Sequence, residues 1–150
     1  MGARKAGARK AATNRHGKVN WYAEDVVVHF TKVSERALEA AAARVDALAK
    51  MNIVANDQVD TGFMVNSVYF ATEDNSSYMD SGGLFTDKHG NQVEREMAPE
   101  ATLPDNATAL VCVGANYAIF QEMANPFLYP ALLAVKGEMK GIIETVAKSD

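Results

Sequence analysis

The chain has 150 residues, a net charge of −4 and a hydrophobic fraction of 48%, a composition typical of one globular domain with its own core. Its single cysteine excludes an internal disulfide and a thiolate cluster for metal. No apolar run approaches the ~20 residues that span a bilayer, and no apolar stretch follows the charged N-terminus as in a secretory signal. We therefore expect a protein made in the cytoplasm, with no membrane partner.

Residues 1–22 are predicted to form a basic arm ahead of an acidic body. Residues 1–20 hold six of the 15 basic residues and no acid, which leaves nine basic against 19 acidic residues in the rest. Small residues and cations bury little apolar area, so we expect a flexible arm and a single domain over residues 23–150. Three interpretations of the arm stay open: contact with nucleic acid, docking onto the acidic surface of a neighbouring subunit, and a solvated tail. The candidate interaction residues are Arg4, Lys5, Arg9, Lys10, Arg15 and Lys18.

A long helix is predicted from about Asp25 to Asn56, because no glycine or proline interrupts this stretch and its middle is rich in alanine. Apolar residues recur there at three- and four-residue spacing and define one face. The small side chains in the middle indicate close approach of a partner, either a C-terminal helix or a sheet. Trp21 and Tyr22 are expected to pin the start of the helix. The predicted apolar face consists of Phe30, Val33, Ala37, Ala41, Val45 and Leu48.

The segment Val59-Asp60-Thr61-Gly62 is predicted to end this helix. Asp60 can accept backbone N–H bonds and is expected to cap the turn that follows, while Gly62 tolerates backbone angles that other residues avoid. A catalytic role for Asp60 would need a partner acid or base, and the neighbouring sequence offers none. Residues 67–72 then have the composition of a β-strand.

An insertion over about residues 76–107 is predicted to contain a β-hairpin. Its strands are expected at residues 84–86 and 92–95, with Gly90 supplying the positive φ that the loop needs. His89 at the tip is interpreted as a solvated turn residue, because a metal site needs several converging groups.

A short apolar run at residues 109–113 is predicted as the last strand. Cys112 lies between two valines there, which favours a buried core position over a reactive one. Gly114 then turns the chain, and Tyr117 and Phe120 are expected to be large anchors. We predict a strand and a tight bend that carry no reactive group.

The pair Asn125-Pro126 marks a boundary, because the residue before a proline avoids the helical region. A helix is predicted to follow, with Pro130 in its first turn, where the missing N–H costs little. Glu122 ahead of this boundary leaves two interpretations open: it satisfies backbone donors at a strand end, or it pairs with a cation on the adjacent subunit of a ring. The apolar face of the helix consists of Leu128, Leu132, Val135, Met139, Ile142 and Val146.

The order of helix, run of strands and helix favours an α+β fold. We predict a long N-terminal helix and a C-terminal amphipathic helix packed on one face of a small antiparallel sheet, with the β-hairpin projecting from it. A sheet this small leaves open edges, and pairing between subunits is one way to cover them.

The sequence contains no motif that indicates catalysis, cofactor binding or metal binding. His16, His29 and His89 do not stand at a metal-binding spacing. There is no nucleophile elbow, no phosphate-binding glycine loop and no paired carboxylate motif. We therefore expect no catalytic residues, no cofactor and no metal.

Two blocks of the sequence resemble a family of bacteriophage proteins. The first, Val59-Asp60-Thr61-Gly62 followed by Ser67-Val68, is similar to V-D-T-G-x-x-x-x-S-[IV]. The second lies within residues 113–132 and reads VG-x-x-YA-x-x-x-E and then PFL-x-PAL. Together they resemble the tail-completion, or head–tail joining, family of long-tailed (siphovirus-like) phages, over about residues 30–147. The matching residues are Asp60, Thr61, Gly62, Ser67, Gly114, Tyr117, Glu122, Pro126, Phe127 and Pro130.

The chain departs from the family pattern directly after Glu122. Met123-Ala124 stands where the family has a glycine–threonine pair, and the loop before Pro126 is nearly deleted. Any contact that this loop makes in other members is therefore not expected here.

The resemblance implies a structural virion protein that forms a ring, a hexamer, at the neck or head-proximal tail end. Its role would be tail completion, tail termination or head–tail connection. The implied partners are copies of itself, the tail tube protein and the head-closure or connector proteins, while DNA passes through the lumen without specific recognition. The alternative is a small nucleic-acid-binding protein that acts through its basic N-terminal arm.

Overall fold

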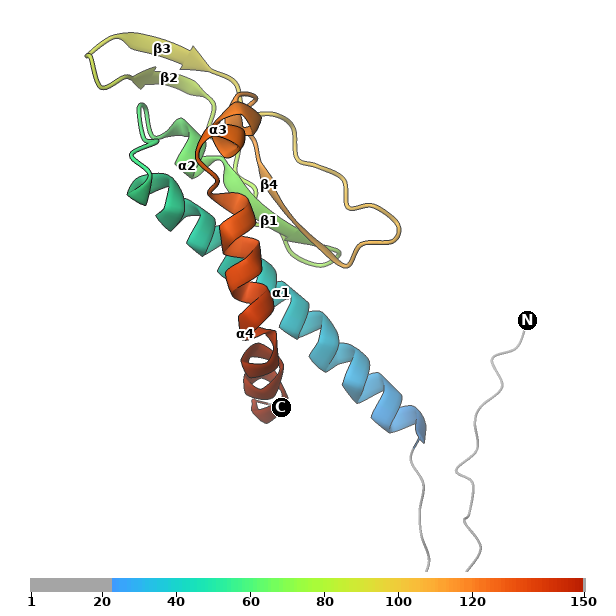
Figure 1. Ribbon diagram of the computed structural model, residues 1–150. Coiled ribbons are helices and arrows are strands. Elements are labelled where there is room, and N and C mark those ends of the chain that lie inside the picture. Colours follow the sequence, from blue (N-terminus) through green and yellow to red (C-terminus); the bar gives the residue numbers. More distant parts are fainter. Residues whose placement is uncertain (1–22, 150) are drawn as a thin grey trace, which may run out of the picture.

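The structure is a computed structural model and describes residues 23–149. The predicted α+β class is confirmed, with the long first helix, the last helix and all four strands near their expected positions. Predictions about the basic arm, Trp21 and Tyr22 lie outside the described residues. In chain order the elements are α1 (Ala23–Ala55), α2 (Phe63–Asn66), β1 (Val68–Thr72), β2 (Gly83–Thr86), β3 (Gln92–Arg95), β4 (Ala109–Val113), α3 (Ala118–Ala124) and α4 (Leu128–Lys148) (Figure 1).

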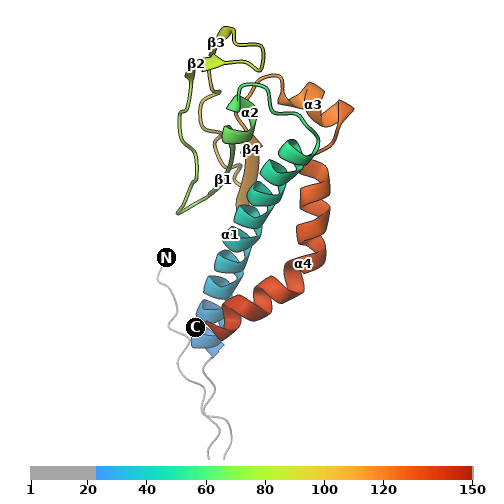
Figure 2. The ribbon, with the colours of Figure 1, turned by 90° about the vertical axis from the view of Figure 1, so that its left-hand side faces the viewer.

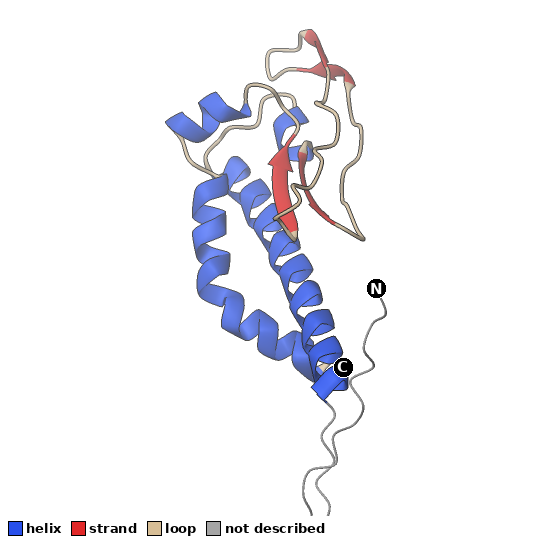
Figure 3. Cartoon of the chain, turned by 90° about the vertical axis from the view of Figure 1, so that its right-hand side faces the viewer, coloured by secondary structure: helices blue, strands red, loops and turns tan. Residues whose placement is uncertain are grey.

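α1 is the central element of the fold. α4 packs along one side of it, and β1 and β4 pack on another side (Figures 2 and 3). The close approach predicted from the alanine-rich middle of α1 is therefore confirmed, and both candidate partners make it. The buried stripe of α1 recurs at four-residue spacing. It consists of Val33, Ala37, Ala41, Val45, Ala49 and Ile53.

The prediction was wrong for Phe30, which is exposed although it lies in the apolar pattern of α1. The reason is that the first turns of α1 extend beyond the rest of the fold (Figure 1). At the other end Asp57, with φ 55°, lies just past the helix, and the amide of Gln58 donates to the carbonyl of Ile53. Such a left-handed residue satisfies the last carbonyls and ends the helix.

The strands form two separate antiparallel pairs rather than the single sheet that was predicted. β1 pairs with β4, with Val68 opposite Val113, and β2 pairs with β3. Cys112 lies opposite Tyr69 and is half-buried, so the buried core position predicted for it is reached only in part. The long connections on either side of β2 and β3 let this hairpin stand apart from the other pair.

The β2–β3 hairpin projects beyond α2 (Figure 1). Gly90 has φ 86° in its turn, as predicted, and the neighbouring His89 is exposed. The ring of Phe85 packs edge-on against the ring of Phe63, with 5.4 Å between centroids. The core therefore holds the hairpin through Phe85, while the side chain of His89 in the turn stays exposed.

α3 was not predicted, because residues 114–125 have the turn residues of a bend and only one helical repeat of apolar side chains. Ala118 is its buried residue, so little of the helix contributes to the core. Phe120, predicted as an anchor, is exposed. The bend is thus a short helix that turns its large side chains outward.

α4 begins at Leu128 and has Pro130 in its first turn, as predicted. Its most buried residues are Ala131 and Val135, whereas Leu132, predicted on the inner face, is exposed. Val135 is buried and Leu128, Met139 and Ile142 pack against the core as predicted, so the inner face differs from the prediction at Leu132, whose place is taken by Ala131.

Candidate functional site

The residues of the two sequence blocks lie together at one end of the molecule. The last turn of α1, α2, α3 and the start of α4 meet there, next to the base of the hairpin (Figures 1 and 2). We call this part the frame and define it as residues 52–67, 85–95 and 113–130. All ten residues that match the two sequence blocks belong to the frame, although they are spread over 71 positions of the chain.

The first block joins the frame to the hairpin. Asp60 Oδ1 accepts a hydrogen bond of 3.0 Å from the backbone amide of Lys88 in the hairpin turn. Capping of the following turn, predicted for Asp60, is instead supplied by Thr61, whose Oγ1 accepts from the amide of Phe63 at 3.2 Å. Gly62 has φ 80°, a left-handed angle that favours glycine. Asp60 thus connects its own segment to the hairpin turn and does not cap the turn that follows it.

Ser67 connects the first block to the second. Its side chain is fully buried, and its Oγ donates to the carbonyl of Met64 at 2.8 Å and accepts from the amide of Ala115 at 3.1 Å. Its carbonyl accepts from the amide of Gly114 at 2.8 Å. A Cβ on Gly114 would come within 2.6 Å of the Met97 side chain, which explains the small residue there. Buried polar groups need such partners, so Ser67 fixes how the blocks meet.

Tyr117 packs over the core between the hairpin and α2. Its ring centroid lies 6.5 Å from that of Phe63, and the Arg95 guanidinium lies 5.1 Å from it. Burial raises the pKa of the Tyr117 hydroxyl above its usual value, against the opposing effect of the Arg95 charge. The hydroxyl is therefore protonated at neutral pH, and the ring acts as an anchor, as its size suggested.

Glu122 caps the start of α4. Its Oε2 accepts from the amides of Phe127 and Leu128 and its Oε1 from that of Tyr129, each at 2.9 Å. Burial by itself would raise the pKa of this carboxyl, but the three amides outweigh it and hold the pKa below its usual value. Of the two interpretations left open, the structure places Glu122 against backbone donors, at a helix start rather than a strand end.

Amide side chains from the end of α1 hold the segment that leads into α4. Asn52 Nδ2 donates to the carbonyl of Phe127 at 2.9 Å, Asn56 Nδ2 to that of Pro126 at 3.2 Å, and Gln58 Nε2 to that of Asn125 at 3.1 Å. Sequence reasoning missed these residues, because an amide at the end of a helix gives no sign of a partner some 70 positions away. They fix the Asn125-Pro126 boundary in place.

The outer surface of the frame is the apolar face of α3. Ile119, Phe120 and Met123 are 63%, 70% and 79% exposed. Met123 lies three residues after Phe120 and four after Ile119, spacings at which side chains are neighbours on a helix surface. Large apolar groups gathered on a surface mark protein interaction sites. These side chains share one face only because residues 118–124 form a helix. The predicted tight bend therefore gave no indication of this face.

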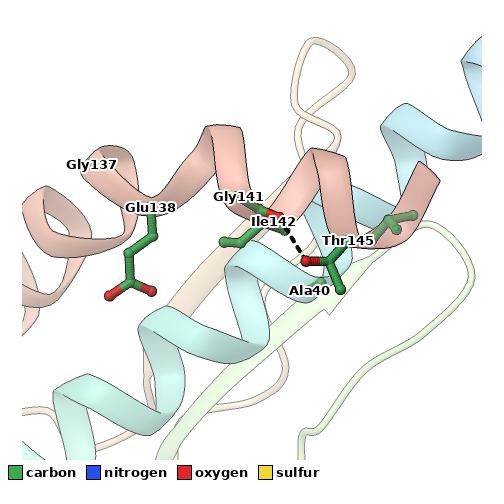
Figure 4. Close-up of a pocket in the computed structure, with 7 residues that line it drawn as sticks. Ala40, Gly137, Glu138, Gly141, Ile142 and Thr145 are labelled. Carbon is green, nitrogen blue, oxygen red and sulfur yellow. Dashed lines mark hydrogen bonds between the residues drawn. The ribbon is translucent and has the colours of Figure 1, made fainter. Parts of the chain in front are cut away.

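Two depressions lie along α4. A groove of about 480 Å³ between α1, β4 and α4 is lined almost entirely by apolar side chains, among them Ala41, Leu110 and Leu132. A second depression, of about 600 Å³, lies where Gly137 and Gly141 face α1 (Figure 4). Its polar lining is already engaged: Thr145 Oγ1 donates to the carbonyl of Gly141 at 2.8 Å, and Glu138 pairs with Arg44 at 3.2 Å. The apolar groove is therefore the better candidate for a contact.

Over residues 23–149, no group of three or more His, Cys, Asp or Glu side chains lies where it could hold a metal ion. None of the helices in this described part is both long and apolar enough to cross a membrane. In comparisons with known proteins, no family model matches this chain, and no curated protein or solved structure matches it significantly.

Proposed function

We propose that this protein is a structural component of the virion of a long-tailed bacteriophage, a ring-forming part of the neck or head-proximal tail end. Support comes from the resemblance of its two sequence blocks to the tail-completion and head–tail joining family. Further support comes from what the matching polar residues do. Asp60 and Ser67 bind backbone groups of segments that are distant in the chain, and Glu122 binds the backbone amides at the start of α4. Such contacts suit a scaffold.

The observation that carries the proposal is the apolar face of α3. Three large side chains lie exposed on a short helix, and the frame beneath them is tied by Glu122 and Gln58. A rigid, preorganised surface loses little conformational entropy on docking, so more of its apolar contact contributes to affinity. The face is suited to docking against the next layer of the particle, either the tail tube or the head-closure protein.

The charge distribution fits passage of DNA through a ring. Residues 21–150 hold nine basic and 19 acidic residues, so the body of the subunit repels a phosphate backbone. DNA would then pass through the lumen without specific recognition. The stable contacts would be those that the head-facing and tail-facing surfaces make with the neighbouring protein layers.

Phe120→Asp is expected to weaken docking on tail ends by roughly 100-fold, because an aromatic anchor is lost and a charge must be desolvated. The test uses tail tubes assembled from the tube protein of the same genome, incubated with tagged protein and scored by electron microscopy. Wild-type protein should decorate one end of each tube. Met79→Asp, at a 74% exposed residue outside the frame, is the control and should decorate normally. Wild-type protein that leaves tube ends bare would contradict the proposal.

Deletion of residues 1–20 distinguishes the virion proposal from the alternative, a nucleic-acid-binding protein that acts through its basic arm. Under the virion proposal, wild-type protein should show weak DNA binding at physiological salt, and the deletion should leave tube-end decoration within about twofold. Tight binding measured by fluorescence anisotropy, with a steep salt dependence that the deletion abolishes, would favour the alternative instead.

A further inference from the structure

The apolar stripe of α1 continues past the point where the subunit covers it. Val26, Phe30, Val33 and Ala37 follow one another at spacings of four, three and four, so they lie on one side of the helix. Val33 and Ala37 are buried, whereas Val26 and Phe30 are 66% and 70% exposed. We call the exposed pair Val26 and Phe30 the overhang.

The end of α4 shows why the overhang is uncovered. Arg36 donates to the Ser149 hydroxyl, so α4 meets α1 near Arg36 and ends there. Val26 lies ten residues before Arg36, about 15 Å along the helix axis. In Figure 1 the first end of α1 leads away from α4 and from both strand pairs.

The apolar groove offers a surface of matching chemistry elsewhere on the same subunit. Ala41, Ala42 and Val45 of α1 line it together with strand β4 and the Leu128 and Leu132 side chains of α4. Its volume of about 480 Å³ has room for several side chains. An open apolar groove and an exposed apolar stripe each gain free energy when they leave water.

The overhang cannot fill the groove of its own subunit. Residues 26–30 and residues 41–45 belong to the same helix, and α1 contains no glycine or proline between Ala23 and Ala55 at which it could fold back. The overhang can therefore fill only the groove of a second copy of the chain.

We propose that the overhang of one copy docks into the apolar groove of the next. This contact is head-to-tail: after one pair forms, one overhang and one groove remain free, and further copies add until a ring closes or a filament grows. The inference rests on the proposed ring and identifies the surfaces that would make it.

The size of the contact predicts its strength. Phe30 can bury on the order of 150–250 Å² and Val26 adds to this, whereas a standard interface buries about 800 Å² per partner. One overhang in one groove is thus a small interface, and an isolated pair should be weak. In a closed ring every copy makes two such contacts, so assembly should be cooperative.

The test measures self-association by analytical ultracentrifugation over a wide concentration range. Phe30→Glu in the overhang and Leu132→Glu in the groove should each raise the concentration needed for association by roughly 100-fold, because a charge would be buried without a partner. Both residues are exposed in the single subunit, so the variants should fold, as circular dichroism can check. Val28→Glu and Leu133→Glu, exposed neighbours that lie off the stripe and outside the groove, should change association by less than about twofold.

Mixing the two variants tests the head-to-tail geometry. Phe30→Glu keeps an intact groove and Leu132→Glu an intact overhang, so at the high protein concentrations that one small contact requires they should together form a one-to-one pair that grows no further. Wild-type protein that stays monomeric, single variants that assemble normally, or a mixture without the pair would each overturn the inference. Loss of assembly on deleting residues 1–20, with Phe30→Glu assembling normally, would show that the arm makes the contact and would overturn it too.

The tail-tube experiment separates this inference from the proposed function. Wild-type protein that decorates tube ends but never self-associates through the overhang would overturn the inference alone. Protein that self-associates as described but leaves tube ends bare would overturn the virion proposal and leave the overhang contact standing.

Discussion

Phe127→Ala is expected to lower the free energy of unfolding by about 3–5 kcal/mol. Phe127 is fully buried in the core with Ile53 and Phe63, directly before the first turn of α4. Its removal would leave a cavity where three segments meet, and the Asn52 bond to its carbonyl would hold the backbone in place around that cavity. A loss of this size is a large part of the total stability of a typical domain.

Urea unfolding measures this effect as a fall in the midpoint at an unchanged slope. Phe120→Ala is the matched control: it removes the same side chain from an exposed site and should change stability by less than about 0.5 kcal/mol. Phe127→Leu keeps most of the apolar volume, so its free energy of unfolding should fall by less than that of the alanine variant. It also provides a readout if the alanine variant does not fold. Equal effects at Phe127 and Phe120 would contradict the placement of Phe127 in the core.

Glu122→Gln is expected to lower the free energy of unfolding by about 1–3 kcal/mol at neutral pH. The substitution keeps the shape of the side chain but removes the charge that three backbone amides at the start of α4, those of Phe127, Leu128 and Tyr129, now bind at 2.9 Å. It also removes the favourable interaction of a carboxylate with a helix N-terminus. Glu144→Gln, which affects only an exposed contact of 3.9 Å with Lys140, should change stability by less than about 0.5 kcal/mol.

The effect of Glu122→Gln should depend on pH. Burial opposes ionisation of Glu122, but the three amides outweigh it and hold its pKa in the folded state below the usual value. A carboxyl with a lowered pKa stabilises the folded state at pH values above its unfolded pKa of about 4.3, and this contribution disappears as the pH falls through the folded pKa. The unfolding free energies of wild type and variant should therefore converge in acid. A difference that stays constant from neutral pH to pH values well below this range would contradict the capping role.

Much of the secondary structure could be predicted because its signals are local. The uninterrupted, alanine-rich pattern predicts α1 to within about two residues of its observed ends. Gly90 and the flanking residues predict the β2–β3 hairpin, because few residues accept the left-handed angle in such a turn. Local signals failed for α3, where seven residues with mostly outward-facing apolar side chains carry too little pattern.

The candidate site could be predicted only as two blocks of residues, without their partners. Asp60 was expected to cap its own turn, but the amide it binds belongs to Lys88 in the hairpin. Ser67 and Ala115 lie 48 positions apart and share a buried hydrogen bond. Which donor meets which acceptor depends on how the elements pack, and one sequence does not contain that information.

By itself, the sequence determined the α+β class, most helix and strand positions and the contrast between a basic arm and an acidic body. These follow from periodicity, turn residues and charge, all of which act over a few neighbouring positions. Only the tertiary structure decided which apolar residues stay uncovered. Phe30, Phe120 and Leu132 fit the same patterns as core residues but are exposed, because burial depends on whether another element lies opposite them.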